Sequence, residues 1–284
     1  MRTLLLSIII CCFFKSHAAK VDTLEIYSKA MKKSYKAAVV LPDSYTESKS
    51  SYPVIYLLHG AYGHFQDWLS NTTDKKIIHN LADNYNVIIV TPEGENFSFY
   101  IDSPVNKESQ FETYITQEVI RKIDQTYRTV NNKKGRVITG LSMGGHGALY
   151  LSARHPDLFA AAGSMSGAVD ISAPDTETRA RMNKMMTPVF GPQGATEEIL
   201  ASHSVMNMLD TIKTNQLELI IDCGVDDYLI DFNRELHRRM VYNKIPHDYT
   251  ERPGAHTWEY WENAIPYHVV FFDKIFKKNG THVK

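Results

Sequence analysis

Short apolar runs recur along the chain, each bounded by turn residues, and they predict the strands of one sheet. They stand at 36–42, 53–60, 86–94, 136–140, 160–167 and 217–224. Their apolar residues are nearly continuous rather than alternating, which is typical of strands buried on both faces of a parallel sheet. The segment 247–251 is also expected to form a strand.

Segments with helical spacing separate these runs, at 73–85, 112–127, 231–244 and 258–278. Strands that alternate with helices of this length indicate βαβ units with right-handed crossovers. The predicted fold class is therefore α/β, with a mostly parallel central sheet and helices on both faces.

One stretch, residues 170–209, does not follow this alternation. It is polar, rich in Met, Thr and Pro, and too long for a simple connection in a compact domain. We interpret it as an insertion that crosses the top of the sheet, over the active site; a surface insertion without functional weight is the alternative. Since no repeat or linker divides the chain, residues 20–284 are expected to form a single domain.

The N-terminus carries a different pattern. Residues 1–19 contain one Arg, an apolar run and a small-residue site, which predicts a secretory signal peptide cleaved after Ala18 or Ala19. The run is shorter than the ~20 apolar residues of a membrane span. A lipoprotein site at Cys11 or Cys12 fits less well, because isoleucines precede Cys11. The sequence thus predicts a secreted or periplasmic protein without a stable membrane span.

Composition argues against a nucleic-acid-binding protein, a disulfide-bonded protein and a Cys-rich metal protein. The chain has 284 residues, a net charge of −1 and no long Lys/Arg run, so no nucleic-acid partner is expected. Without residues 1–19 only Cys223 remains of the three cysteines, which precludes an intrachain disulfide and a Cys-rich metal site. No metal or cofactor is expected, and the sequence does not indicate an oligomeric state.

A candidate nucleophile lies in the pentapeptide Gly140-Leu141-Ser142-Met143-Gly144, which matches G-x-S-x-G. The run "VIT" before it and "GALYLSARHP" after it predict the strand, tight turn and helix that this motif requires. Such a turn presents the serine oxygen at the top of the sheet, next to a helix N-terminus that favours developing negative charge. Ser142 is the predicted nucleophile, and the Met143 N–H is a predicted oxyanion donor.

An activated serine needs a base, and His256 is the candidate. It lies in a Gly-containing loop after the expected strand 247–251, late in the chain, as the order Ser, acid, His demands. Four other histidines have ordinary structural or surface explanations: His59, His146, His237 and His268. Trp258 follows the base and is expected either to pack in the core or to wall the site.

The acid must come from the stretch "IDCGVDDYLI". Asp222 lies within the expected strand and is assigned a structural role. Asp226 and Asp227 both follow Gly224, in the loop where the acid belongs. Position in the fold therefore leaves these two aspartates open.

Three segments, "YLLHGAYG", "GLSMGGHGAL" and "GAHTWEYW", together resemble the esterase D / antigen 85 group of α/β-hydrolases. This group includes S-formylglutathione hydrolases, mycolyltransferases and feruloyl or acetyl-xylan-type esterases. The resemblance extends from about Lys36 to Phe276 and implies an α/β-hydrolase fold with a Ser-His-Asp triad. It implies Ala61 as the second oxyanion donor. Its pattern Cys-Gly-x-x-Asp-x-Leu implies that the acid is Asp227.

The substrate side is less defined. The loop 94–104 follows an expected strand and should overhang the same end of the sheet, so Phe99 and Tyr100 are predicted substrate contacts, with Trp258 as a third. Such aromatic residues can also serve only as anchors.

The expected function is a secreted serine carboxylesterase acting on a small-molecule or polysaccharide-linked acyl ester. Export argues against S-formylglutathione and favours feruloyl or acetyl esters of plant polysaccharide. The alternatives are an antigen 85-type acyltransferase, an S-formylglutathione hydrolase-like thioesterase, and a non-catalytic member of the fold.

Overall fold

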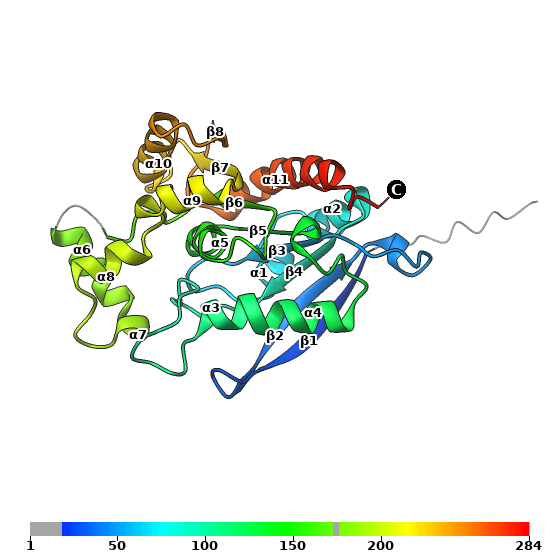
Figure 1. Cartoon of the computed structure of the whole chain (residues 1–284), viewed down its shortest axis with the longest axis horizontal. Coiled ribbons are helices and arrows are strands. Elements are labelled where there is room, and N and C mark those ends of the chain that lie inside the picture. The colour runs from blue at the N-terminus through cyan, green and yellow to red at the C-terminus, as the bar shows by residue number, and fades with distance from the viewer. Residues whose placement is uncertain (1–18, 173–175, 284) are drawn as a thin grey trace, which may run out of the picture.

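The computed structural model describes residues 19–172 and 176–283 (Figure 1). The predicted signal peptide, apart from Ala19, lies outside the described residues, as do Cys11 and Cys12. Among the described residues, no helix is both long and apolar enough to cross a membrane.

Within the described residues, eight strands form one sheet in the order β1-β2-β4-β3-β5-β6-β7-β8. The strands from β3 to β8 pair in parallel, while β1 with β2 and β2 with β4 are antiparallel. The sheet is therefore mostly parallel, as predicted. The strands are β1 (Lys20–Ser28), β2 (Lys33–Leu41), β3 (Val54–Leu58), β4 (Ile88–Pro92), β5 (Arg136–Gly140), β6 (Ala161–Met165), β7 (Glu218–Gly224) and β8 (Asp248–Arg252).

The N-terminal part of the sheet departs from the sequence-based expectation. The run 36–42 belongs to an antiparallel strand, β2, rather than to the parallel sheet, and β1 was not expected at all. β1 is an edge strand with most of its residues exposed or half-buried. An edge strand needs few apolar residues, so it leaves no continuous hydrophobic signal in the sequence.

The central strands are buried on both faces, which explains their continuous apolar runs. In β3, Val54, Tyr56 and Leu58 enter one hydrophobic cluster, while Ile55 and Leu57 enter a second cluster. Successive side chains of a strand point to opposite faces, so the two clusters lie on opposite sides of the sheet.

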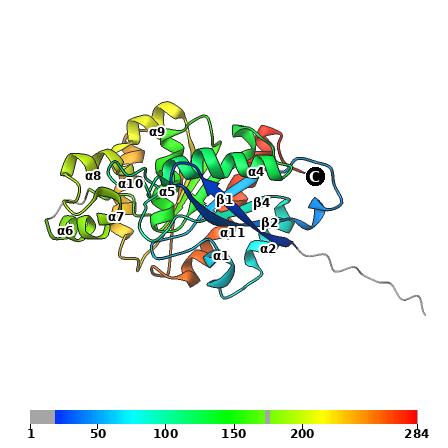
Figure 2. The ribbon, with the colours of Figure 1, turned by 90° about the horizontal axis from the view of Figure 1, so that it is seen from below.

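Helices cover both of these faces (Figures 1 and 2). The first cluster includes residues of several helices, among them α3 (Phe111–Thr113), α4 (Ile120–Thr126), α5 (Met143–Arg154), α9 (Leu209–Asn215) and α10 (Ile230–Tyr242). The second cluster packs against α1 (Asp67–Ser70), α2 (Ile77–Tyr85) and α11 (Trp258–Asn279). The expected α/β architecture with helices on both faces is confirmed.

The predicted helices form with small changes at their ends. The helix expected at 73–85 begins at Ile77, and the one expected at 112–127 is interrupted by a π-helical stretch, η2 (Tyr114–Val119). The helix expected at 258–278 is α11, in which the Thr257 side chain accepts a hydrogen bond from the Tyr260 N–H and caps the first turn. Short 3₁₀ turns complete the chain: η1 (Asp43–Tyr45), η3 (Lys133–Gly135) and η4 (Val205–Asn207).

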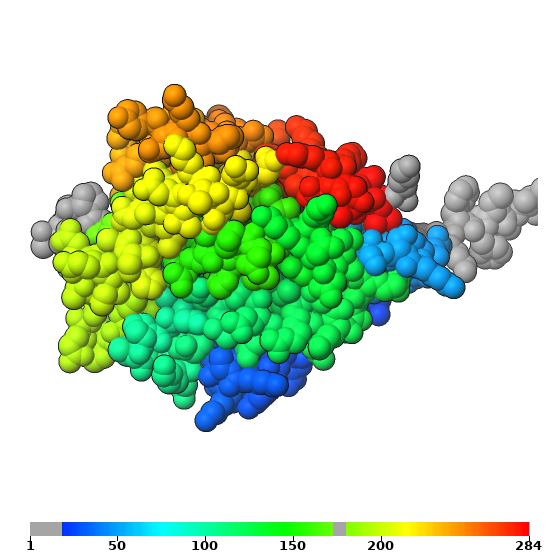
Figure 3. Space-filling view, viewed as in Figure 1, coloured from blue at the N-terminus to red at the C-terminus, as the bar shows by residue number. Residues whose placement is uncertain are grey.

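The stretch 170–209 contains several short helices in the part that the structure describes. It contains α6 (Thr176–Met185), α7 (Thr187–Phe190) and α8 (Glu197–His203), which lie together at one end of the molecule (Figures 1 and 3). The Asn106 side chain donates a hydrogen bond to the Pro188 carbonyl, so this group of helices contacts the loop after β4.

Packing of α11 against the sheet should be a major source of stability. Phe272 has no exposed surface in the second cluster, so Phe272→Ala is expected to lower the free energy of unfolding by about 3–5 kcal/mol. Lys274→Ala, two residues away on the exposed side, is the matched control and should change it by less than about 0.5 kcal/mol. Urea unfolding measures both values. Equal midpoints for the two variants would contradict this placement of α11.

Candidate active site

Ser142 occupies a strained turn between β5 and α5. Its φ of 55° and ψ of −116° lie in a region that costs a non-glycine residue about 1–3 kcal/mol. The surrounding backbone maintains this conformation, since the Ser142 N–H donates to the Met165 carbonyl at 2.9 Å. The predicted strand, turn and helix are therefore present, and the serine lies at the carboxyl edge of the parallel strands.

Two glycines permit the close packing of this turn. A Cβ at Gly144 would lie 2.5 Å from the His59 carbonyl oxygen, and a Cβ at Gly60 would lie 2.5 Å from the Leu141 side chain. At Gly144 the contact is with backbone atoms, so the first turn of α5 and the loop after β3 can meet only because this residue has no Cβ; at Gly60 the contact is with the end of a flexible side chain. Their contact brings the residue after Gly60 next to Ser142.

Ser142, His256 and Asp227 form a continuous hydrogen-bonded chain. His256 Nε2 lies 2.9 Å from Ser142 Oγ, and His256 Nδ1 lies 2.8 Å from Asp227 Oδ2. Because a carboxylate only accepts, Nδ1 donates to Asp227, and Nε2 is left to accept the serine proton. The three residues thus have the geometry of a nucleophile, a base and an orienting acid.

The loop after β7 places the two candidate acids, Asp226 and Asp227, in different environments. The Asp227 carboxyl is buried, and its Oδ1 accepts from the Leu229 N–H at 2.8 Å. Burial raises the pKa of Asp227, but the hydrogen bonds from His256 and Leu229 outweigh it and hold the pKa below its ordinary value. Asp226 is exposed, and its N–H donates to the Gly254 carbonyl at 2.9 Å.

Asp222 belongs to a separate buried network. Its carboxylate accepts from the Tyr260 hydroxyl and pairs with Arg252, which links β7, β8 and α11. Burial raises the pKa of Asp222, although both partners act in the opposite direction. These contacts agree with the structural role expected for this residue. The neighbouring Cys223 is a buried free thiol.

The backbone N–H groups of Met143 and Ala61 are the candidate donors of an oxyanion site. Met143 is the first residue of α5, where the N–H groups have no acceptor within the helix. In the part of the chain that the structure describes, the Ala61 N–H makes no backbone hydrogen bond. Met143 directly follows Ser142, and Ala61 follows Gly60, at which an added Cβ would lie 3.4 Å from Ser142 Cβ.

Glu93 and His59 secure the loop that carries Ala61. His59 Nδ1 lies 2.8 Å from the Gly60 carbonyl oxygen, and its Nε2 lies 2.8 Å from the Gly94 nitrogen and 3.4 Å from Glu93 Oε1. Glu93 accepts from the Phe65 and Glu95 N–H groups. Burial raises the pKa of Glu93, but His59 and these N–H groups lower it to about 2, so the carboxylate stays ionised.

Two of the three predicted substrate contacts, Phe99 and Tyr100, need correction because of their burial, while Trp258 stays a prediction. Phe99 is almost fully buried and packs edge-on against His146, while Tyr100 is fully buried and donates its hydroxyl proton to the His59 carbonyl. Side chains enclosed in this way have no surface to offer a ligand, and both serve as anchors of their loop. Trp258 is half-buried, and its ring contacts are with Trp68 and Trp261.

Two exposed tyrosines next to the triad were not predicted. Tyr228 directly follows Asp227, is 68% exposed and packs its ring 4.5 Å from that of His256. Tyr62 directly follows Ala61 and is 71% exposed. Their positions in the sequence, directly after the predicted acid and the predicted oxyanion donor, were the signal that could have identified these two tyrosines. The sequence does not reveal, however, which aromatic residues face solvent.

Among the described residues, the other histidines have no part in this chain of contacts. Burial lowers the pKa of His146 to about 4 and that of His268 to about 3, so both are neutral near pH 7. His237 lies on α10, hydrogen-bonded to His247. Within residues 19–172 and 176–283, no cluster of three or more His, Cys, Asp or Glu side chains is arranged to hold a metal ion.

Comparisons with known proteins show which proteins the chain is similar to. The family model described as "Putative esterase" matches residues 28–272. An acetyl esterase of Caldicellulosiruptor saccharolyticus is 29% identical over 258 residues, which cover 85% of this chain and 94% of that protein. A solved structure of a ferulic acid esterase, 29% identical, superposes with a TM-score of 0.76 and covers 91% of this chain and 98% of its own.

A more distant relative is the diacylglycerol acyltransferase/mycolyltransferase Ag85B of Mycobacterium leprae. It is 31% identical over 168 residues, which cover 56% of this chain and 48% of that protein. The chain therefore matches nearly the whole length of the acetyl esterase but about half of the acyltransferase.

The two adjacent aspartates should differ sharply on substitution. Asp227→Asn keeps the shape of the side chain but no longer stabilises the correct tautomer of His256, so kcat should fall by roughly 10⁴-fold. The exposed Asp226→Asn is the matched control and should stay close to wild type. Hydrolysis of p-nitrophenyl butyrate measures both. A greater loss in Asp226→Asn would exchange the roles of the two residues.

The lowered pKa of Glu93 predicts a pH-dependent contribution to stability. Its carboxylate stabilises the fold fully above its unfolded-state pKa of 4.5, and this stabilisation is lost as the pH falls through about 2. Glu93→Gln should therefore lower the free energy of unfolding at neutral pH by up to about 3 kcal/mol, and the difference should vanish near pH 2. Urea unfolding across this range tests the prediction.

The exposed Glu25→Gln provides the control, with little change expected at any pH. A Glu93→Gln effect that is as large near pH 2 as at neutral pH would show that charge is not the cause.

Proposed function

The chain belongs to the esterase family of α/β-hydrolases and is a carboxylic ester hydrolase, and from this premise we propose that Ser142, His256 and Asp227 are its catalytic triad. The resemblance of its three sequence segments to the esterase D / antigen 85 group is thereby confirmed. The observation that carries the proposal is the hydrogen-bonded chain from Ser142 through His256 to Asp227.

In the first half of the reaction, Ser142 Oγ attacks the ester carbonyl carbon while His256 Nε2 takes the serine proton. The carbonyl oxygen becomes negative and accepts hydrogen bonds from the Met143 and Ala61 N–H groups. Buried Asp227 accepts from His256 Nδ1 and stabilises the imidazolium. The ester C–O bond then breaks, His256 protonates the departing alcohol, and an acyl-enzyme remains.

In the second half, a water molecule attacks the acyl-enzyme, and His256 removes its proton. The same oxyanion donors stabilise the second tetrahedral intermediate. Ser142 regains its proton from His256 as the acid product leaves. This sequence needs no group beyond the side chains and backbone of the described site.

The proposed substrate is an acetyl or feruloyl ester of plant polysaccharide. Supporting this, an acetyl esterase and a ferulic acid esterase each match nearly their whole length to this chain. The exposed ring of Tyr228 beside His256 offers a flat surface on which an aromatic acyl group or a sugar ring can pack. The N-terminal sequence supports a secreted or periplasmic location, where such polysaccharides are met.

Ser142→Ala should abolish hydrolysis of p-nitrophenyl butyrate, with a loss of roughly 10⁴-fold or more in kcat. Labelling by a fluorophosphonate probe should disappear in the same variant, because only an activated serine reacts. Ser164→Ala, at the end of the neighbouring strand, is the control and should keep both properties. Wild-type hydrolysis by Ser142→Ala would refute the proposed nucleophile.

The substrate class is tested on acetylated xylan, methyl ferulate and S-formylglutathione. We expect the highest kcat/KM on one of the first two. Preference for S-formylglutathione would support the thioesterase instead, and transfer of the acyl group to an added sugar in preference to water would support the acyltransferase.

A further inference from the structure

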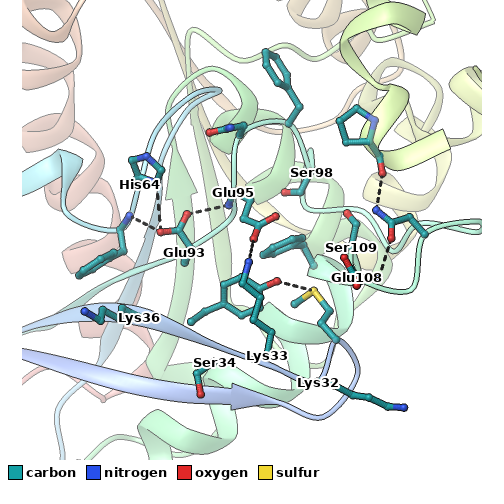
Figure 4. Close-up of a pocket in the computed structure, with 18 residues that line it drawn as sticks. Lys32, Lys33, Ser34, Lys36, His64, Glu93, Glu95, Ser98, Glu108 and Ser109 are labelled. Atoms are coloured by element: carbon teal, nitrogen blue, oxygen red, sulfur yellow. Dashed lines mark hydrogen bonds and ion pairs between the residues drawn. The ribbon is translucent and has the colours of Figure 1, made fainter. Parts of the chain in front are cut away.

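A cleft of about 880 Å³ lies beside the active site but includes none of the triad residues. Its walls are the start of β2 with the turn before it, the loop after β4, and residues 64 and 65 (Figure 4). Pro188, from the group of helices α6 to α8, borders it as well. The volume lies within the roughly 300–1,000 Å³ that is common for ligand sites.

The cleft opens at the same edge of the sheet as Ser142. β2 is antiparallel to β4, with Ala37 opposite Pro92, so β2 begins where β4 ends. From β5, which carries Ser142, to β2 there are three strand spacings in the order β2-β4-β3-β5, or roughly 14 Å. Only an extended ligand with its ester at Ser142 could also reach this cleft.

The surface between the two sites is continuous. Tyr62 follows the oxyanion residue Ala61, its N–H donates to the Asn96 carbonyl at 3.0 Å, and its ring packs edge-on against Phe97 at 4.3 Å. Asn96 and Phe97 in turn line the cleft. A ligand chain that leaves Ser142 past Ala61 thus passes over Tyr62 and enters the cleft.

The charges of the cleft do not favour an ion of either sign. Three lysines and three glutamates line it: Lys32, Lys33, Lys36, Glu93, Glu95 and Glu108. Lys33 and Glu95 pair across it at 2.6 Å, as Figure 4 shows. Glu93 is already held by backbone N–H groups. An anionic or a cationic ligand would meet repulsion from one of these sets.

The remaining lining groups suit a neutral polyol. Phe65 contributes half-buried aromatic surface, and the exposed side chains of His64 and Asn96 both donate and accept hydrogen bonds. A sugar has the matching combination, because its hydroxyls donate and accept while its C–H faces pack on aromatic rings.

We propose that this cleft is a distal subsite that binds the glycan part of an ester-substituted oligosaccharide while its acyl group is at Ser142. The proposal rests on the proposed function, which it deepens from ester hydrolysis to recognition of the carbohydrate chain. It predicts that the enzyme favours oligosaccharide esters over esters of a single sugar, since only the former span both sites.

The test compares acetylated xylo-oligosaccharides with acetylated xylose and p-nitrophenyl acetate. Glu108→Trp places a large ring in the cleft at an exposed loop position. It should raise KM for the oligosaccharide at least tenfold and leave the two small esters unchanged. Lys107→Trp, the exposed neighbour that does not line the cleft, should leave all three unchanged. Asn96→Trp gives a second obstruction from the other wall.

Equal kcat/KM of wild-type enzyme for acetylated xylo-oligosaccharide and acetylated xylose would overturn the subsite. So would a Glu108→Trp defect of the same size on all three esters. In both results the wild-type enzyme stays active on p-nitrophenyl acetate, so they are distinguishable from failure of the proposed function.

A binding measurement covers the case in which no ester is hydrolysed. Unsubstituted xylo-oligosaccharide is titrated calorimetrically into Ser142→Ala protein, with and without Glu108→Trp. Binding that Glu108→Trp weakens at least tenfold supports the subsite independently of catalysis, and absence of binding to either protein refutes it.

Discussion

The contact between the first turn of α5 and the end of β3 is the constraint on which the site depends. At Gly144 a single Cβ would collide with the carbonyl groups of Leu58 and His59. Because that atom is missing, the helix begins directly against the strand, and Ser142 is held in a conformation that it would not adopt alone. The strain is confined to the turn at Ser142. The buried and paired strands β3 and β5 keep the backbone of this turn from relaxing.

The rest of the site is brought to this serine by the sheet. Loops after β5, β7 and β8 leave the same edge, so residues 142, 227 and 256 meet although 114 positions separate the serine from the histidine. The buried carboxyl of Asp227 sets the tautomer of His256, and the packing of Tyr228 and Trp261 on the imidazole limits its rotation. Hydrogen bonds of Glu93 and His59 likewise hold the loop that carries Ala61. The proposed nucleophile Ser142 and the cleft near β2 thus lie along one edge of the sheet.

Much of this arrangement was predictable from local pattern. Continuous apolar runs identified the strands from β3 to β7, because a strand buried on both faces leaves no room for polar residues. The pentapeptide around Ser142 defined the turn, and the late glycine-containing loop identified His256. By contrast, the edge strand β1 was not found, since one exposed side and a solvated edge remove the hydrophobic signal.

The sequence by itself determined the fold class and was enough to select the proposed nucleophile and the proposed base, because each depends on short-range spacing between residue types. The tertiary structure decided which aspartate turns inward. Asp226 and Asp227 are adjacent and chemically identical, and only the path of the loop after β7 buries the second against His256. It likewise decided that Phe99 and Tyr100 are enclosed while Tyr62 and Tyr228 are exposed. Exposure depends on what distant segments pack against a residue, and a linear pattern carries no record of those contacts.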